Sequence, residues 1–242
     1  MRPFLFSSVA FAFVLIAWIL GMSFGSMLPT EHMSSDSKDA VRLGMGLVAT
    51  TVALVLGLLV ASAKSFYDTQ NNEVTQLAAN VVLLDRVLAH YGPEASDSRA
   101  TLRAGSEYWR EVLQNGNSFR RGEFFLDRIQ ELSPKDDNQR VLKAQASNLA
   151  IQMGQTRWLM FAQNTVPVPK LLLVMLIFWL TVLFISFGIF APRNLTVKSG
   201  LFMAALAVAG AIFLILEMYQ PHNGLIQVSD APLRAAFAQL GQ

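Results

Sequence analysis

The 242-residue sequence contains no cysteine, which excludes disulfide bonds, thiolate metal sites and a cysteine nucleophile. Its histidines, His32, His90 and His222, are far apart and show no HExxH or similar spacing, so a zinc site is not expected. Charge is also scarce, because Asp, Glu, Lys and Arg make up 15% of the residues, against roughly 25% in soluble domains. The net charge of +2 is too small to indicate nucleic-acid binding.

In place of charge the sequence has four long apolar stretches, none of which contains a charged residue. A helix needs roughly 17–25 mostly apolar residues to cross a bilayer, and it satisfies its backbone polar groups internally. The first stretch exceeds the roughly 7–15 apolar residues of a signal-peptide core, so we expect it to remain as a span. The predicted spans are residues 4–28, 43–63, 171–190 and 200–216.

Short polar connections join the spans in pairs. The first connection reads PTEHMSSDSKDA and the second reads APRNLTVKS, and each contains a helix-breaking proline, Pro29 or Pro192. The sequence therefore predicts an all-α membrane protein whose four transmembrane helices form two hairpins flanking a helical extramembrane domain. The expected parts are a first hairpin at 1–63, a helical domain at 64–168, a second hairpin at 169–217 and a C-terminal tail at 218–242.

The central segment carries twelve basic and twelve acidic residues, a balance typical of solvated helices. No Gly or Pro interrupts residues 61–91, so the second span is expected to continue as one long helix that ends at Gly92 and Pro93. Further helices are expected from Pro93 to Leu113, around Phe125, and from Ser133 to about Phe161. The apolar face of the long helix is expected to comprise Val74, Leu77, Val81, Leu84, Leu88 and Tyr91. That of the last helix is expected to comprise Leu142, Ala146, Leu149 and Met153.

Small residues follow helical spacing in the membrane stretches. Gly21 and Gly25 are four residues apart in the first span, and a similar series runs through the second span. Small residues let helix backbones approach closely, either within one subunit or between subunits around a central pore. The second-span series is Ala49, Ala53, Gly57 and Ala61.

The second span also offers candidate pore-lining residues. The hydroxyls of Thr50 and Thr51 either bond to their own helix or line a water path. In the second case Leu54 and Leu58 would form an apolar constriction. The absence of ionisable residues within the spans argues against a proton-coupled transporter or pump.

Two charged residues lie at span ends. Glu217 follows the fourth span and is either an interfacial carboxylate or the partner of a basic residue such as Lys64, which would couple the domain to the membrane.

Asp85, Arg86, Arg99 and Arg103 are expected to form a salt-bridged helix surface. No nucleophile elbow, phosphate loop or metal-ligand spacing occurs, so neither an enzyme nor a cofactor or metal site is expected.

Several stretches resemble the bacterial bestrophin-like domain family, over most of the chain from about residue 43. They read LVATTVALVLGLLVASAKSFYD, LLDRVLAHYGPEA, TRWLMFAQN, FWLTVLFISFGIFAPRN and AIFLILEMYQPHNGLIQVSDAPLRAAFAQLG. Tyr219 and His222 stand where that family would have Asp and Phe. The resemblance implies the domain order of bestrophins, which are pentameric anion channels with a pore lined by the second span. The acidic cluster of their calcium clasp is absent, so calcium gating is not expected. The aromatic residues of their pore neck are absent as well.

These observations support two functional hypotheses. The first is a homo-oligomeric ion channel for an anion in the bilayer of a bacterial inner membrane, with Thr50, Leu54 and Leu58 lining the pore. The second is a membrane scaffold or signalling protein whose helical domain binds a protein partner. Basic residues near the membrane boundaries favour cytoplasmic termini and a cytoplasmic central domain.

Overall fold

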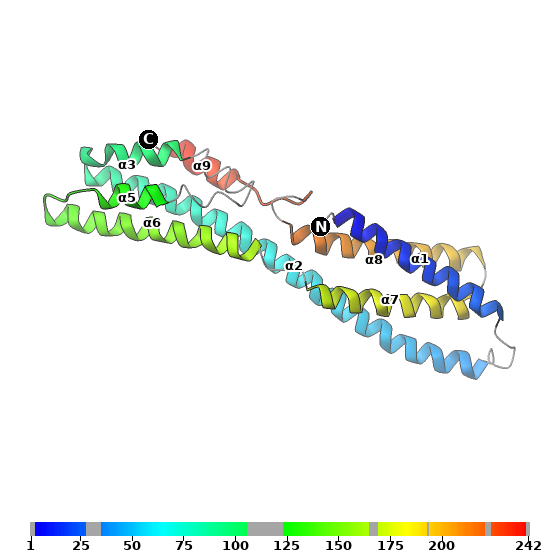
Figure 1. Cartoon of the computed structure of the whole chain (residues 1–242). Helices are drawn as coiled ribbons and strands as arrows, with labels where there is room; N and C mark the ends of the chain where they lie inside the picture. The colour runs from blue at the N-terminus through cyan, green and yellow to red at the C-terminus, as the bar shows by residue number, and fades with distance from the viewer. Residues whose placement is uncertain are drawn as a thin grey trace. The chain divides into compact units, whose positions relative to one another are not determined.

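The computed structural model describes residues 3–27, 35–105, 123–164, 169–192, 194–220 and 224–240. Within these ranges every regular element is a helix (Figure 1). The elements are α1 (Pro3–Met27), α2 (Ser35–Tyr91), η2 (Pro93–Ala95), α3 (Ser96–Ala104), α5 (Glu123–Gln130), α6 (Asp137–Asn164), α7 (Lys170–Phe190), α8 (Leu195–Met218) and α9 (Ala231–Gln239). They divide into unit 1, Met1–Phe66 and Pro167–Tyr219, and unit 2, Tyr67–Val166 and Gln220–Gln242.

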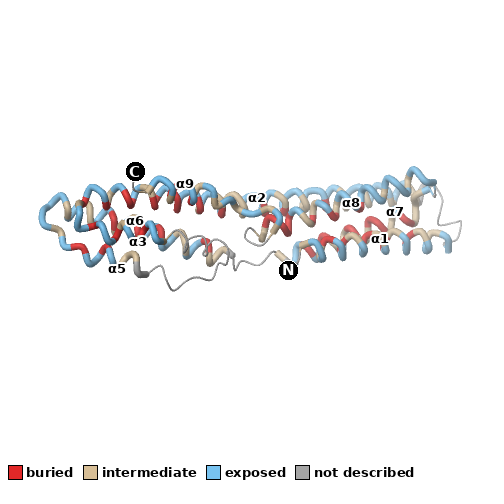
Figure 2. Tube along the Cα trace, turned by 90° about the horizontal axis from the view of Figure 1, so that it is seen from above, coloured by how far each residue is buried: buried red, intermediate tan, exposed pale blue. Residues whose placement is uncertain are grey.

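Unit 1 contains the apolar helices. α1, α7, α8 and part of α2 are each long and apolar enough to cross a membrane, which confirms the four predicted spans. α1 packs against both α7 and α8. Figure 2 shows buried positions on the sides of α1 and α8 that face the other helices. The buried apolar residues of these three helices are Ala10, Val14, Ala17, Leu173, Leu176, Leu180, Leu183, Phe184, Ala205, Ala209, Ile212, Ile215, Leu216 and Met218.

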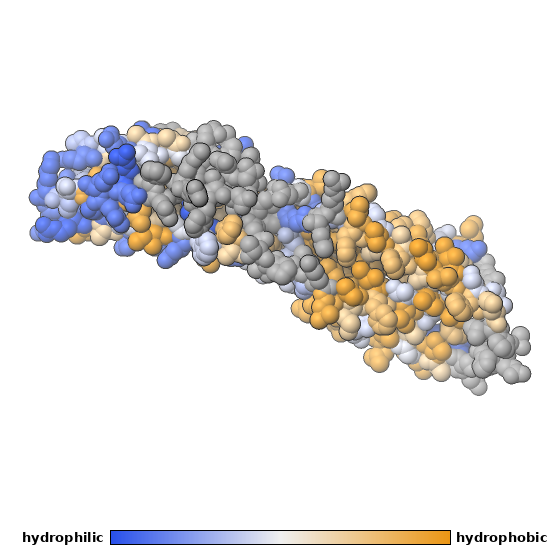
Figure 3. Space-filling model, in the orientation of Figure 1, coloured by the Kyte–Doolittle hydropathy of each residue, from blue (hydrophilic) through white to orange (hydrophobic). Residues whose placement is uncertain are grey.

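The outer surface of unit 1 is apolar as well. On the face drawn in Figure 3, hydrophobic residues gather over α1, α7 and α8. Phe4, Phe13, Val174 and Met203 are all more than half exposed. Soluble proteins rarely show so large a continuous apolar surface, whereas a lipid-facing helix requires one.

Both polar connections of unit 1 are shorter than expected. α2 begins at Ser35 and α8 begins at Leu195, so each helix takes residues that the sequence analysis placed in a loop. At α8 the cause is a helix cap, because the backbone N–H of Val197 donates to the side-chain oxygen of Asn194 at 3.0 Å. Such a cap satisfies one of the otherwise unpaired N–H groups of the first turn.

Unit 2 is built around the second part of α2. The predicted continuous helix is confirmed, since α2 runs unbroken to Tyr91 and Gly92 follows with a φ of 118°. α6 packs along α2, and α3, α5 and α9 complete the core. The predicted apolar face of α2 is buried throughout, and Ala146 and Met153 are buried on α6, with Leu142 and Leu149 half-buried beside them.

The remaining helix predictions for unit 2 differ in their bounds. After the short turn η2, α3 ends at Ala104. Residues 106–122, which include the end of the helix predicted to reach Leu113, lie outside the described residues. The segment predicted as a tail contains α9, whose Leu233 and Ala236 are buried in the core of unit 2. The Tyr67 hydroxyl on α2 donates to the Gln227 carbonyl at 3.1 Å and holds the segment before α9.

Candidate functional site

Within unit 1, the apolar part of α2 is buried on one side only. Its buried residues in the apolar stretch, Val52, Leu59 and Ala63, lie on one face of the helix. At 3.6 residues per turn the opposite face is a second, exposed line. We call this line the open face of α2, comprising Leu43, Leu47, Thr50, Leu54, Gly57, Leu58 and Ala61. In the most apolar 18 residues of α2, only 11% of the residues are buried, against 28–33% in the corresponding stretches of the other three spans.

The three predicted pore-lining residues lie together on the open face. Leu54 is 70% exposed and Leu58 is 65% exposed, and Thr50 is exposed between Leu47 and Leu54. The Thr50 and Thr51 hydroxyls donate to the carbonyls of Gly46 and Leu47, at 2.9 Å and 3.0 Å. Their donor capacity is therefore met within the helix, and each hydroxyl oxygen still has acceptor capacity.

The small residues of the second span border the same face. Ala53, Gly57 and Ala61 are exposed, and Ala49 is half-buried. A Cβ placed on Gly57 would meet no atom within 4 Å. Among the described residues of this chain, no helix therefore packs against α2 at Gly57.

Gly21 and Gly25 of α1 have the opposite environment. A Cβ on Gly21 would lie 2.2 Å from the Ile185 carbonyl oxygen of α7, and one on Gly25 would lie 2.8 Å from that of Ile189. On the α7 side, a Cβ on Gly188 would lie 2.4 Å from the Trp18 carbonyl oxygen. Gly188 could not be predicted from the sequence, because a single glycine in an apolar run shows no spacing pattern.

Lys64 and Glu217 both belong to unit 1, Lys64 just after the apolar stretch of α2 and Glu217 at the end of α8. Glu217 is 2% exposed, whereas Lys64 is exposed, and both make polar contacts. The contact between α2 and the end of α8 in this region was not expected from the sequence. The Tyr219 ring lies on Phe66 with a centroid distance of 5.3 Å, and its hydroxyl is 3.1 Å from the Ser62 hydroxyl.

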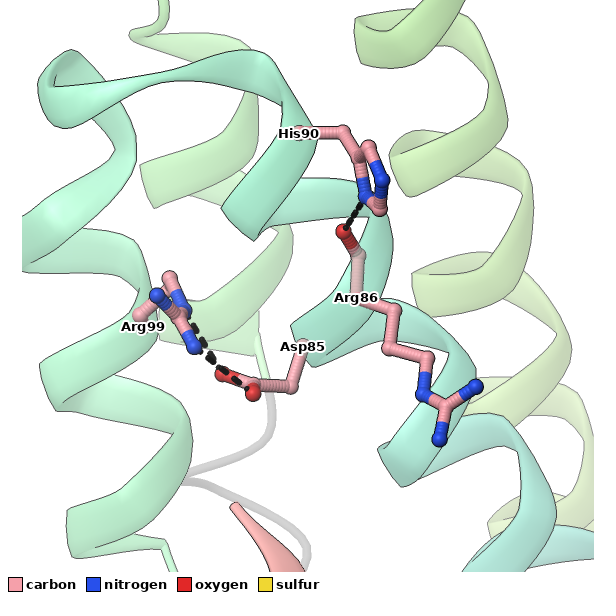
Figure 4. A network of polar contacts seen from close by, with 4 residues as sticks. All are labelled: Asp85, Arg86, His90 and Arg99. Atoms are coloured by element: carbon pink, nitrogen blue, oxygen red, sulfur yellow. Dashed lines mark hydrogen bonds and ion pairs between the residues drawn. The ribbon is translucent and has the colours of Figure 1, made fainter. Parts of the chain in front are cut away.

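The described part of unit 2 contains a bidentate ion pair. The Arg99 guanidinium of α3 donates to both carboxylate oxygens of Asp85 on α2, at 2.8 Å and 2.9 Å (Figure 4). The hydrogen bonds to Asp85 raise the pKa of Arg99. The predicted salt bridge is confirmed for this pair, but Asp85 is 6% exposed and therefore lies inside the domain.

Arg86 and His90 accompany this pair without joining it. His90 Nδ1 lies 2.8 Å from the Arg86 carbonyl oxygen, which only accepts hydrogen bonds, so Nδ1 carries the hydrogen (Figure 4). This is a bond within one turn of α2. No nucleophile or acid–base pair is assembled around it in the described residues.

A chain of polar side chains links α2 to α6 and was missed by sequence reasoning. Gln70 Nε2 donates to Gln163 Oε1 at 2.6 Å, and Gln163 Nε2 donates to Glu73 Oε1 at 2.7 Å. Burial raises the pKa of Glu73, and the hydrogen bond from Gln163 partly offsets this. Only the three-dimensional pairing of α2 with α6 brings these residues together, because Gln163 is 90 residues away from Glu73.

A second polar group lies at the turn after α2. Lys135 donates to Glu94, and this bond lowers the pKa of the Glu94 carboxyl and raises that of Lys135. Gln139 Nε2 donates to the Tyr91 carbonyl at 3.0 Å and fixes the start of α6 at this turn. In the described parts of the chain, no three His, Asp or Glu residues are placed to hold a metal ion.

Comparison with known proteins places this architecture in a family. The model of the Bestrophin-like domain matches residues 11–233, which include α2, α7 and α8, most of α1 and most of unit 2. Neither the curated proteins nor the solved structures gave a match. The chain is therefore a multi-pass membrane protein that belongs to the Bestrophin-like domain family.

Proposed function

We propose that several copies of this chain form an ion channel for anions, with the open face of α2 lining the pore. The observation that carries the proposal is that this face stays exposed along the whole apolar part of α2. Lipid alone would also cover an exposed apolar face. Exposed Ala53, Gly57 and Ala61 favour a neighbouring helix, because small residues permit close backbone approach and offer lipid little contact area.

The chemistry of the open face suits a gated pore without fixed charge. Leu54 and Leu58 present large apolar side chains one turn apart, and a ring of such residues from several subunits closes a pore by excluding water. Lys64 lies beyond them and is exposed, on the same side of the helix as Gly57 and Ala61. Its positive charge would raise the local concentration of anions at that mouth.

The topology is part of the same proposal. We expect hairpins at 1–63 and 169–217, with the domain at 64–168 and the segment at 218–242 on the cytoplasmic side of a bacterial inner membrane. Because the chain has no cysteine, single cysteines report this directly. A cysteine in place of exposed Val141 should react with a membrane-impermeant thiol reagent only in inside-out vesicles, and reaction in right-side-out vesicles would overturn the orientation.

The subunit contact is tested by cross-linking. Gly57→Cys and Ala61→Cys should form disulfide-linked species between copies in native membranes, because these positions border the proposed interface. Val174→Cys on α7 is the matched control, since it is 61% exposed on another helix and outside the proposed contact. Equal cross-linking at Val174, or none at Gly57 and Ala61 in a protein that is a monomer by mass, would contradict the proposal.

The pore is tested by anion flux from vesicles that contain the purified protein. Leu54→Thr shortens the apolar constriction and adds a hydroxyl, so flux should rise above that of the unmodified protein. Leu206→Thr on α8 is the control, because Leu206 is 48% exposed on a helix outside the proposed pore. Flux no higher than in empty vesicles for both the parent and Leu54→Thr would rule out a channel.

One observation favours partner binding as a second function. Residues 144–156 of α6 carry no charge, and the outward side of α6 exposes Ile151, Trp158 and Leu159, each 44–50% exposed. A solvated helix usually shows charge on its outward side. A protein partner with an apolar helix face would cover this surface.

This second function is tested by affinity capture from the native membrane. Trp158→Ala should release a stoichiometric partner, because aromatic residues dominate binding energy at interfaces. Val141→Ala is the control, since Val141 is exposed on the same helix nearly five turns away. If the same proteins are captured with either variant, or none is captured at all, this function is excluded.

A further inference from the structure

The polar chain between α2 and α6 is incomplete on its acceptor side. Gln70 and Gln163 each donate one N–H within the chain, and the Glu73 carboxylate accepts one of them. Gln70 Oε1 and Glu73 Oε2 are buried and receive no hydrogen bond. Gln70 is 0% exposed, so bulk water does not reach its amide.

Two buried oxygens without a donor are costly. A buried acceptor that loses its partner costs about 1–3 kcal/mol, and a buried carboxylate costs more unless it is paired or neutral. Gln70 and Glu73 are three residues apart on α2, which places their side chains next to each other on one face of the helix. One added hydrogen between them would satisfy both oxygens.

We propose that Glu73 is protonated in this conformation and donates its proton to Gln70 Oε1, which closes a ring of three hydrogen bonds. In the ring Gln70 donates to Gln163, Gln163 donates to Glu73, and Glu73 donates to Gln70. Gln70 Oε1, Glu73 Oε1 and Gln163 Oε1 then each accept one bond, and Glu73 Oε2 carries the proton and donates one. We call this arrangement the Gln–Gln–Glu ring, comprising Gln70, Glu73 and Gln163. It joins α2 to α6 beyond the apolar part of α2.

The surroundings favour the neutral acid. The shift in the pKa of Glu73 comes from burial, which raises it, and from Gln163, which lowers it, with no charged group among its causes. Arg157 is the sole ionisable side chain of α6 between residues 144 and 164, and it makes contacts of its own. Asp68 lies on α2 itself, and the C-terminal segment contributes Asp230 and Arg234, which pair with each other at 3.0 Å.

Loss of the proton would open the ring. The carboxylate would keep one donor from a neutral amide, and Gln70 Oε1 would again have none. Separation of α2 from α6 at this point would let water reach both groups. The ring therefore makes the contact between α2 and α6 sensitive to pH, whether or not the protein conducts ions.

The sign of the pH dependence follows from the raised pKa of Glu73. A group with a higher pKa in the folded state stabilises it fully below its unfolded value of 4.5, and this contribution is lost as the pH rises through the folded pKa. Glu73→Gln replaces the acid with an amide that donates to Gln70 at every pH. The variant therefore resembles the protonated ring permanently.

Hydrogen exchange of the full-length protein in nanodiscs tests the ring. After correction for intrinsic exchange, amides near Gln70 and Gln163 in the unmodified protein should lose protection between a lower pH near 4.5 and a higher pH, as the pH rises through the raised pKa of Glu73, and those of Glu73→Gln should not. Gln163→Leu should lower protection at the lower pH, because the ring cannot form without Gln163. Glu131→Gln is the matched control on an exposed glutamate and should leave the pH response unchanged.

Infrared spectroscopy gives an independent readout of the proton itself. The unmodified protein at the lower pH should show the carbonyl stretch of a buried protonated carboxylic acid, and Glu73→Gln should lack it. An identical pH response in the parent and in Glu73→Gln, or a band that survives this substitution, would overturn the proposal. Restoration of protection at high pH by sodium or potassium would also overturn it, because a metal cation rather than a proton would then occupy the ring.

Discussion

Gly21 and Gly188 face each other where α1 crosses α7. A Cβ on Gly188 would lie 2.8 Å from the Gly21 Cα atom, which is closer than side-chain carbons approach backbone. The absence of a side chain on both residues is therefore what permits the crossing at this distance. Gly21 and Gly25 therefore serve helix packing within one chain. Gly57 of α2 differs, because a Cβ there would meet no atom within 4 Å.

The crossing predicts a clear contrast between glycines. Gly21→Ala should destabilise the protein by about 1–3 kcal/mol, because the added methyl group would overlap the Ile185 carbonyl. Gly210→Ala on α8 should be neutral or stabilising by up to about 1 kcal/mol, since its Cβ meets no atom within 4 Å and alanine favours a helix. Thermal unfolding of both variants in detergent measures this, and equal losses would contradict the tight crossing.

The buried ion pair of unit 2 should matter more than the exposed ones. Arg99→Met removes the guanidinium that pairs with the buried Asp85 carboxylate. We expect a loss of stability of about 2–3 kcal/mol, less than for a fully buried pair, because about a quarter of the Arg99 side chain is exposed. Arg128→Met breaks an ion pair with Glu131 that is more than half exposed on both sides and should cost less than about 1 kcal/mol. Denaturant titrations of the two variants should differ accordingly, and a larger loss for Arg128→Met would refute this ranking.

The last helix should contribute to the stability of unit 2. Leu233→Ala removes a side chain that is 3% exposed within the core, and we expect a loss of about 2–4 kcal/mol. Leu225→Ala changes a leucine of the same segment that is 84% exposed and should have no measurable effect. Proteolysis of the two variants under native conditions provides the measurement. Resistance of Leu233→Ala equal to that of Leu225→Ala would mean that α9 does not contribute to the core.

The acidic side of the stability profile should depend on Glu94. Because Lys135 lowers the pKa of Glu94, this carboxyl stabilises the fold above its unfolded value of 4.5 and loses its contribution as the pH falls through the folded pKa. In Glu94→Gln the free energy of unfolding should therefore fall less steeply as the pH is lowered. The effect should be small, because both groups are exposed to solvent. Raising the ionic strength should reproduce most of that effect in the unmodified protein. A profile that stays as steep in Glu94→Gln would assign the acid sensitivity to another group.

Sequence reasoning succeeded where a pattern extends over several turns. The apolar series from Val74 to Tyr91 and the absence of Gly and Pro after Ala61 were sufficient to predict one long helix, because periodicity and missing helix breakers are local properties. Helix starts were harder. At α8 the start depends on a single bond from the Val197 N–H to Asn194, which no apolar pattern reveals.

The contacts that sequence reasoning missed involve residues far apart in the chain. Gln70, Glu73 and Gln163 are individually ordinary helix residues, and their significance depends on the register between α2 and α6. Ser62 and Tyr219 likewise meet only because of how α2 and α8 pack. The candidate pore residues were predicted only in part. Spacing predicted that Thr50, Leu54 and Leu58 share a face, but their exposure required the structure.

The position of α9 has a consequence for biosynthesis. The residues of unit 2 are not contiguous, because Pro167–Tyr219 of unit 1 separates Tyr67–Val166 from Gln220–Gln242. The ribosome must therefore complete α7 and α8 before Leu233 exists to cover the core of unit 2. Chains emerge at roughly 5–20 residues per second, so the intervening 53 residues (219 − 167 + 1) correspond to a delay of several seconds. During that interval both apolar helices can enter the membrane, while the unfinished core of unit 2 is exposed to chaperones and proteases.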